Sequence, residues 1–352
     1  MSLGAQARFE YQLFHYPQDG SVEMYDMRNR RAFLRRTKPR PELSTSELYP
    51  GNVITLFSRQ LSVTSYGDDR TRARLASNQQ RALMLLPPHS LFNAFSLIHS
   101  ICHFNHLALA SIRSFTLSSP AEAERLVPSA DDNSRAMLSN GTCIAAELVG
   151  ESAIERVRSA CFSSSGAAIA ACDDEDTTKD AINFVHSSAT SLQGSATLRD
   201  CTLGIVKPHA VKRGVACEIL EHVQHQLGGI SAVQSFRVSK ANSGEFLEVY
   251  KGVLPEYSQM VDELSAGMCI AFEVSANATD YKRSGEESVV EALRGACGPL
   301  DPEIARVLRP KSVRAKFGID KVKNAVHCTD LEDDGPLESE YFFSVLAGDG
   351  QQ

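Results

Sequence analysis

An internal repeat in the part of the chain after residue 80 constrains the fold more than any other feature of the sequence. Three short segments recur in the same order, as LLPPHSL (85–91) and IVKPHAV (205–211), GTCIAAEL (141–148) and GMCIAFEV (267–274), and INFVHSS (182–188) and KNAVHCT (323–329). Matches that keep their order indicate a duplicated unit. We therefore predict two related domains, copy one at residues 81–197 and copy two at residues 198–348.

Each copy alternates the patterns of strands and helices. In copy two, apolar runs predict strands at 201–207, 229–239 and 268–275. Apolar residues at helical spacing predict helices at 213–227 and 243–264. Taken alone, this alternation favours a parallel sheet with helices packed on it.

The first 66 residues have a different pattern, in which short aromatic and β-branched runs are separated by turn residues. The runs are FEYQLFHY, SVEMYD, RAFLRRT, VITLF and LSVTSY, with PQDG, NR and YPGN among the turns. This pattern predicts about five short antiparallel strands. We expect a small β-barrel or sandwich domain at residues 1–80.

Composition excludes several classes of protein. The net charge of -7 argues against a protein devoted to the backbone of DNA. No apolar run approaches the ~20 residues that a membrane span needs, and the N-terminal stretch lacks a secretory pattern. The 9 cysteines include no C-x-x-C pair, which suits reduced thiols in the cytoplasm. We expect neither DNA nor membrane partners.

The charge is unevenly distributed along the chain. Residues 28–40, RNRRAFLRRTKPR, carry seven basic side chains and no acidic one. Such a run is either a solvated strand edge or a surface for an acidic partner. The sequence leaves both interpretations open.

The two copies differ in length and in charge. From the Pro-His motif to the histidine of the third segment, copy one runs 99 positions (87 to 186) and copy two 120 (207 to 327). Copy two has ARVLRPKSVRAKFG where copy one has the acidic and small-residue stretch CFSSSGAAIAACDDEDTTKD. Arg and Lys supply the charge-assisted hydrogen bonds that hold phosphate. We therefore expect an anion site only in copy two.

The polar side chains of copy two suggest phosphoryl-transfer chemistry when they are taken together. Lys207, Arg294 and Arg314 can hold a polyphosphate and offset charge in a transition state. A neutral histidine such as His327 can attack phosphorus, and a carboxylate such as Glu338 can hold its ring. Each residue alone fits an ordinary surface or packing role, so the hypothesis depends on the set.

This set resembles the nucleoside diphosphate kinases. The resemblance spans residues 201–346 and lies in the motifs VKPHAV, RGACG, RPKSVRAKFG, NAVHCTD and LESEYFF. It implies a four-stranded antiparallel sheet in place of the parallel one. The fold expected for the chain is thus α+β, with two tandem ferredoxin-like domains after a small antiparallel β domain.

The resemblance also implies a role for each residue of copy two. His327 would be the phosphorylated nucleophile, and Glu338 would orient its ring. The nucleotide would be held by Lys207, Tyr250, Arg294, Arg314 and Asn324, with Tyr257 as the candidate for stacking on the base. The implied reaction is ping-pong exchange of γ-phosphate between ATP, GTP or other triphosphates and diphosphates. Mg²⁺ would enter on the phosphates, with no metal site on the protein.

Copy two departs from the family in three places. Leu300 occupies the position of a family threonine, and His209 that of a family aspartate. The stretch GVLPEYSQMV is two residues shorter than the family pattern. The sequence therefore leaves open whether copy two turns substrate over or only binds nucleotide.

Copy one resembles the same family but lacks its chemistry. Pro87 replaces the lysine, and Asn183 and His186 remain without the arginine pair. We predict that His186 is structural and that copy one is inactive. We also predict that the two copies pack about a pseudo-twofold axis, as in an isologous dimer.

The three-part layout resembles one branch of the family more closely. Members of that branch are axonemal proteins of ciliary doublet microtubules and occur at centrosomes with γ-tubulin complexes. This implies a cytoskeletal location in cilia or flagella, with tubulin and neighbouring inner proteins as partners. The alternatives are a structural scaffold without turnover and a soluble housekeeping kinase.

A possible metal site lies outside these motifs. His99, Cys102, His103 and His106 have spacings that share one helix face, and such ligands suit Zn²⁺. The same segment carries an apolar stripe that includes Cys102, so the histidines are more simply its polar edge.

Overall fold

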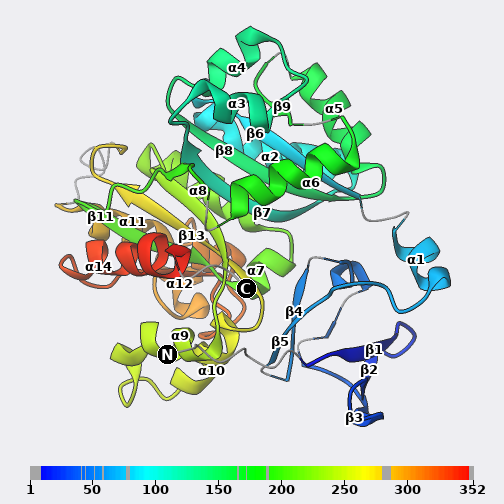
Figure 1. Cartoon of the computed structure of the whole chain (residues 1–352). Coiled ribbons are helices and arrows are strands. Elements are labelled where there is room, and N and C mark those ends of the chain that lie inside the picture. The colour runs from blue at the N-terminus through cyan, green and yellow to red at the C-terminus, as the bar shows by residue number, and fades with distance from the viewer. Residues whose placement is uncertain are drawn as a thin grey trace, which may run out of the picture. The chain divides into compact units, whose positions relative to one another are not determined.

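The computed structural model describes residues 9–40, 42–43, 45–50, 52–57, 59–76, 80–164, 166–171, 173–187, 190–279 and 287–348. The chain divides into two compact units, Met1–Gln79 and Gln80–Gln352 (Figure 1). Both predicted copies belong to the second unit.

The first unit contains five short antiparallel strands, as the sequence predicts. They form a three-stranded sheet, β1 (Tyr11–Tyr16), β2 (Ser21–Asp26) and β3 (Arg31–Thr37), and a separate hairpin, β4 (Val53–Leu56) and β5 (Arg59–Ser62). The short helices are η1 (Thr45–Glu47) and α1 (Asp69–Ala76). Alternate residues of β2 and β4 point into one small core, which includes Val22, Met24, Ile54 and Leu56.

Copy two has the order βαββαβ. Its strands are β11 (Cys201–Val206), β12 (Ala232–Arg237), β13 (Met268–Ser275) and β14 (Val326–Cys328). Helix α8 (Ala216–Leu227) joins the first pair, and α11 (Val289–Cys297) lies between the last pair. The strands lie side by side in the order β14-β11-β13-β12, and every neighbouring pair is antiparallel. This is the ferredoxin-like arrangement, so the expected α+β class is confirmed.

Copy one repeats this framework. Its strands are β6 (Gln80–Leu86), β7 (Ala108–Thr116), β8 (Thr142–Gly150) and the short β9 (Ile169–Ala170), in the spatial order β7-β8-β6-β9. Helices α2 (Ala94–Asn105) and α5 (Ala153–Ser163) occupy the places of α8 and α11 in the chain order.

The connections carry the remaining elements. In copy one they are η2 (Pro88–Asn93), α3 (Pro120–Leu126), α4 (Asp132–Leu138), α6 (Glu175–His186) and β10 (Gln193–Gly194), which pairs with β7. In copy two they are α7 (Pro208–Lys212), α9 (Lys240–Phe246), η3 (Glu248–Tyr250), α10 (Tyr257–Leu264), α12 (Pro302–Leu308), α13 (Val313–Phe317), α14 (Asp334–Glu340) and the π-helical η5 (Tyr341–Leu346).

The single helix predicted at 243–264 is wrong, because the segment contains α9, η3 and α10. Gly252 between them has a φ of 78°, a left-handed conformation that ends a helix. Pro255 follows three residues later and lacks the amide hydrogen that a continuous helix would need.

The two copies join through their second strands. β7 and β12 pair antiparallel with Arg113 opposite Gln234. Ser114 Oγ bonds both the N–H and the C=O of Val233, at 2.8 and 3.1 Å, and Ser235 Oγ bonds both groups of Ile112 at the same two distances. This reciprocal pattern is that of an isologous contact, so the predicted pseudo-twofold packing is confirmed.

The joined sheet has one shared core and two separate ones. On one face, α2, α5, α8 and α11 cover both copies and bury a single continuous apolar cluster. On the opposite face, α6 of copy one covers a cluster around Phe115, and α10 and η5 of copy two cover another around Phe236. The two copies therefore fold as one body.

The third repeat match is wrong. KNAVHCT includes β14, whereas the described part of INFVHSS, residues 182–187, lies in α6 and its C-cap. The register identifies the true counterpart: His327 lies opposite Ile205, and Ile169 lies opposite the equivalent Leu85. An Asn and a His three residues apart occur in a helix in copy one and at a strand in copy two. A match in sequence alone therefore does not show that the two histidines are structurally equivalent.

Candidate active site

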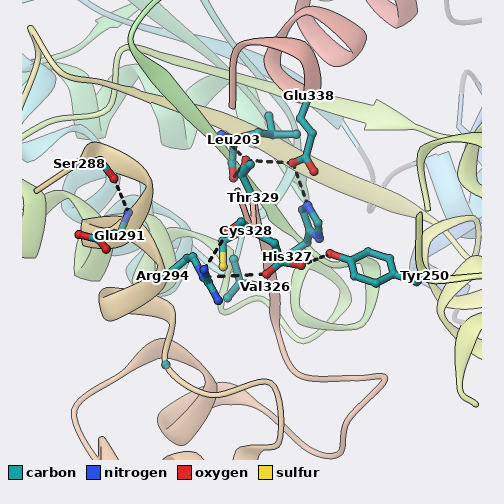
Figure 2. A network of polar contacts seen from close by, with 12 residues as sticks. Leu203, Tyr250, Ser288, Glu291, Arg294, Val326, His327, Cys328, Thr329 and Glu338 are labelled. Atoms are coloured by element: carbon teal, nitrogen blue, oxygen red, sulfur yellow. Dashed lines mark hydrogen bonds and ion pairs between the residues drawn. The ribbon is translucent and has the colours of Figure 1, made fainter. Parts of the chain in front are cut away.

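A cavity of about 590 Å³ opens in copy two around the end of β14. Its wall contains six of the residues that the sequence predicts for the site: Lys207, Tyr250, Arg294, Arg314, Asn324 and His327. Glu338 lies behind His327 and outside the wall, and Tyr257 also lies outside it. Figure 2 shows Glu338 and Tyr250 approaching the histidine end of the strand from different elements.

The ring of His327 is held on two sides. Its Nε2 lies 3.1 Å from Glu338 Oε2, which also accepts a hydrogen bond of 2.9 Å from Thr329 Oγ1. The Phe246 ring meets the imidazole edge to face at 5.1 Å. Because an ionised carboxylate only accepts, Nε2 carries the proton. The lone pair of a neutral ring is therefore on Nδ1.

Arg314 holds the backbone beneath the cavity. Its Nη1 donates to Gly298 O at 2.7 Å, and its Nε and Nη2 donate to Val326 O at 3.3 and 3.2 Å. Gly298 has a φ of 80°, and a Cβ there would lie 2.2 Å from Ser312 Oγ. Only glycine fits this turn, which brings α11 and α13 to the same point.

Lys207 follows β11 and is almost fully buried at the cavity wall. Its Nζ donates to Val322 O at 2.9 Å. Burial and the neighbouring Arg314 charge lower the pKa of Lys207 to about 7. An anion placed in the cavity would favour the charged ammonium.

Tyr250 and Arg294 converge on Asp330. The Tyr250 hydroxyl donates to Asp330 Oδ2 at 2.5 Å, and Arg294 Nη1 donates to Asp330 O at 2.7 Å. Burial and the Asp330 hydrogen bond raise the pKa of Tyr250. Tyr250 is therefore a neutral hydrogen-bond donor at physiological pH.

Asn324 is fully buried in the cavity wall. Its Nδ2 donates to Leu300 O at 3.1 Å, while its Oδ1 has no partner among the described residues. The next residue, Ala325, has a φ of 73°, a costly conformation for alanine. A buried acceptor next to backbone strain favours a ligand group as its partner.

The departures from the family motif have distinct locations. Leu300 lines the cavity and is 40% exposed. His209 lies outside the wall, with Nδ1 2.7 Å from Glu263 Oε1. Tyr257 donates from its hydroxyl to Gly244 O at 3.1 Å, so the structure does not bring it to the other predicted residues.

Four polar residues of the wall were not predicted: Glu291, Arg309, Cys328 and Asp330. Arg309 belongs to the basic stretch of copy two, and Asp330 closes the NAVHCTD motif, so both had a sequence signal. Cys328 belongs to the same motif, whereas Glu291 had no such signal, because only the folded chain brings it to the cavity.

His186 of copy one belongs to a partly buried polar network. His186 Nε2 lies 2.8 Å from Ser111 Oγ, which donates to Glu147 Oε2 at 2.8 Å, and Arg81 pairs with the same carboxylate. Burial lowers the pKa of His186 to about 4. These contacts support a structural role for His186.

The histidine face of α2 shows no ligand arrangement. His99 and His103 stack with ring centroids 6.1 Å apart, while Cys102 packs against the core. Within the described ranges, no group of three or more His, Cys, Asp or Glu side chains is placed to hold a metal ion. None of the helices in those ranges is long and apolar enough to cross a membrane.

Comparisons with known proteins identify the family of the chain. The family model described as nucleoside diphosphate kinase matches residues 200–346. The nucleoside diphosphate kinase homolog 7 of Rattus norvegicus is 37% identical over 96% of this chain and 89% of its own length. The homologue from Mus musculus has the same identity and coverage.

Shorter relatives match copy two. The nucleoside diphosphate kinase of Aquifex aeolicus is 33% identical over 41% of this chain and 94% of its own length. A crystal structure of the Aquifex aeolicus enzyme covers 42% of this chain and 96% of its own, with a TM-score of 0.35. Given the full-length relatives, this chain belongs to the nucleoside diphosphate kinase family, among its homolog 7 members.

Proposed function

We propose that copy two transfers the γ-phosphate of a nucleoside triphosphate to a nucleoside diphosphate through a phosphohistidine at His327. The observation that carries this proposal is the 3.1 Å contact between His327 Nε2 and Glu338, at the wall of a cavity lined by cations. It leaves Nδ1 as the nucleophilic atom beside groups that bind phosphate.

The cations of the wall would hold the polyphosphate. Lys207, Arg294, Arg309 and Arg314 come from four different segments of copy two. Arginine forks match phosphate oxygens, and a lysine acts as a point charge. Charge would then be neutralised at the γ-phosphate, where it builds up during transfer.

The first half-reaction forms one bond and breaks one. Nδ1 of His327 bonds to the γ-phosphorus, and the bond from that phosphorus to the bridging oxygen breaks. The electron pair leaves on the nucleoside diphosphate. The phosphorylated ring becomes cationic, and Glu338 stabilises that charge through Nε2. The reverse step passes the phosphoryl group to a second diphosphate.

The proposal also assigns groups that would bind the ribose, the base and the metal ion. The free Oδ1 of Asn324 would accept from a ribose hydroxyl, and Val253 and Leu254 offer apolar surface for the base. Mg²⁺ would enter on the phosphate oxygens, where it neutralises charge. The cavity fits this use, because its cations face the phosphates and its Asp330 is already engaged by Tyr250.

Exchange of label between GTP and CDP tests the proposal. His327→Ala should lower the exchange rate by ~10⁴-fold or more, because it removes the nucleophile. His186→Gln serves as the matched control and should stay within about twofold of wild type per folded molecule. Exchange that survives in His327→Ala would rule out the proposed nucleophile.

A second function is a structural role at microtubules. We propose that the chain binds axonemal doublets in cilia through the basic segment 28–40, with tubulin as the acidic partner. All seven basic side chains of this segment are exposed, among them Arg31 and Arg35 of β3. Copy one, which has Ile169 in place of a nucleophile, adds surface without phosphate chemistry. The resemblance of the three-part layout to axonemal members supports this role.

Co-sedimentation with microtubules tests the second function. Arg31→Glu combined with Arg35→Glu should weaken binding by roughly tenfold or more at low salt, since both charges reverse. Lys179→Glu, on α6 of copy one, is a single charge reversal that serves as the control and should leave binding unchanged. Binding that survives both reversals would show that the basic segment is not the contact, and a wild-type chain that does not sediment with microtubules would favour the housekeeping enzyme.

A further inference from the structure

One cysteine of copy two borders the cavity, and a second lies on the helix that packs against its strand. Cys328 is the residue after His327 on β14, and its side chain is part of the cavity wall (Figure 2). Cys297 is the last residue of α11, which packs against β14. Both cysteines belong to the same buried cluster, and hydrogen bonding with Cys297 lowers the pKa of Cys328.

Arg314 faces the same sulfur. Its Nη2 lies 3.6 Å from Cys328 Sγ, and its other donors reach only backbone carbonyls. Among the described residues, no carboxylate forms an ion pair with this nearly buried guanidinium. A buried charge is costly unless it is paired. The Cys328 sulfur, as a thiolate, is the one anion that the described contacts supply.

The electrostatics of the pair agree with this assignment. The Cys297 hydrogen bond and the Arg314 charge lower the pKa of Cys328, against the effects of burial and Asp330. The pKa of Cys297 is raised by the same hydrogen bond and by burial. Within the pair, Cys328 is therefore the sulfur that ionises first.

Other cysteines behave differently. Burial raises the pKa of Cys102, Cys143 and Cys161 to about 12, so these thiols stay protonated. Thiolates react with peroxides and protonated thiols hardly do. Among the described cysteines, Cys328 thus combines a lowered pKa, a place in the cavity wall and a second cysteine on the adjacent helix.

We propose that Cys328 and Cys297 form an oxidation site at the cavity wall, with a hydroperoxide such as hydrogen peroxide as its substrate. The Cys328 thiolate attacks a peroxide oxygen, the O–O bond breaks, and the departing hydroxide takes up a proton to become water. This gives a sulfenic acid at Cys328. The Cys297 sulfur then attacks the Cys328 sulfur, a disulfide forms, and a second water leaves.

Peptide mapping after brief treatment of the full chain with hydrogen peroxide tests the site. The disulfide between Cys297 and Cys328 should form before any other cysteine reacts. Its rate should fall by roughly tenfold from pH 7 to pH 5, as the thiolate is protonated. Oxidation that begins at other cysteines, or a rate that does not change with pH, would overturn the proposal.

Two variants separate the two sulfurs. Cys297→Ser keeps the nucleophile and removes the second thiol, so dimedone should trap a sulfenic acid at Cys328 and no disulfide should form. Cys328→Ser should show neither product. Cys102→Ser is the matched control and should give the wild-type disulfide. A Cys297→Ser protein that melts like wild type but yields no dimedone adduct would contradict the proposal.

Formation of the disulfide can be measured without phosphoryl transfer. The expected effect of a nucleotide on it rests on the proposed function. Added ADP should slow the oxidation, because its phosphates would fill the cavity and oppose the thiolate. A Cys297–Cys328 disulfide that forms equally fast with ADP would support the oxidation site and count against nucleotide binding in the cavity.

Discussion

Copy one and copy two share a framework and differ in what is inserted into it. Both have the βαββαβ order, and they meet through equivalent strands with reciprocal serine contacts. From the Cys-Ile-Ala strand to the fourth strand, however, copy one has 26 positions (143 to 169) and copy two has 58 (269 to 327). The extra length contains α12 and α13, with Arg309, Arg314 and Asn324. Two of the four cations proposed to hold phosphate, Arg309 and Arg314, therefore come from an insert, and the framework supplies Lys207 and Arg294.

The fourth strand shows the same contrast at one position. His327 and Ile169 occupy equivalent places in the ladder, opposite Ile205 and Leu85. In copy two the side chain faces a carboxylate and a cavity, while in copy one it packs with the apolar cluster around Phe115. Loss of the insert and loss of the nucleophile thus go together.

Apart from His327 itself, the largest effect is expected at Glu338, which contacts that histidine in copy two. Glu338→Gln should lower kcat by about 100-fold with little change in KM, because the amide cannot neutralise the phosphorylated imidazole. Steady-state exchange kinetics measure this. Glu340→Gln, an exposed position on the same helix, is the control and should match wild type. An unchanged kcat for Glu338→Gln would mean that the carboxylate does not act on His327.

The next largest effect is expected at the junction between β7 and β12, which the two copies share. Ser114→Ala and Ser235→Ala should each lower the free energy of unfolding by about 1–3 kcal/mol, since each leaves a buried backbone N–H and C=O without a partner. The pseudo-twofold axis predicts similar losses for the two variants. Urea unfolding followed by circular dichroism measures them, with the exposed Ser118→Ala as control. Strongly unequal losses would break the symmetry of the junction.

The affinity for ADP should depend on pH through a group of copy two. Lys207 has a pKa of about 7 in the empty cavity, and bound phosphate should raise it. Between the two pKa values binding takes up a proton, so ADP affinity should fall as pH rises above 7, by at most about tenfold per unit. Calorimetry in buffers of different ionisation enthalpy measures the proton. Lys207→Met should remove the uptake, and uptake that persists would assign it to another group.

The smallest effect is a gain at Leu300. Leu300→Thr adds a hydroxyl to the cavity wall and should raise kcat/KM by about two- to fivefold. Leu308→Thr, an exposed position on α12, is the control. Equal kinetics for Leu300→Thr and wild type would show that the phosphates do not reach this side of the cavity.

The sequence predicted most of the strands, and it predicted Lys207, Arg294 and Arg314 of the cavity wall. Both predictions follow from local sequence patterns. Apolar runs identified β11 and β13, and the Lys-Pro and Asn-x-x-His motifs identified Lys207 and His327. The counterpart of His327 in copy one was mistaken, because strand register is a property of paired chains and no local pattern records it. The lowered pKa of Cys328 was equally hidden, since it arises from the contacts that α11 and α13 make with β14.

The most direct test of the contrast between the copies is the site and number of phosphohistidines. The full chain is incubated with γ-labelled ATP and Mg²⁺, and acid-labile, base-stable phosphate is mapped by mass spectrometry. We predict at most one such phosphate per chain, on His327, unchanged in His186→Gln and absent from His327→Ala. Label on a histidine of copy one, or acid-labile label that persists in His327→Ala, would contradict the assignment of phosphate chemistry to copy two.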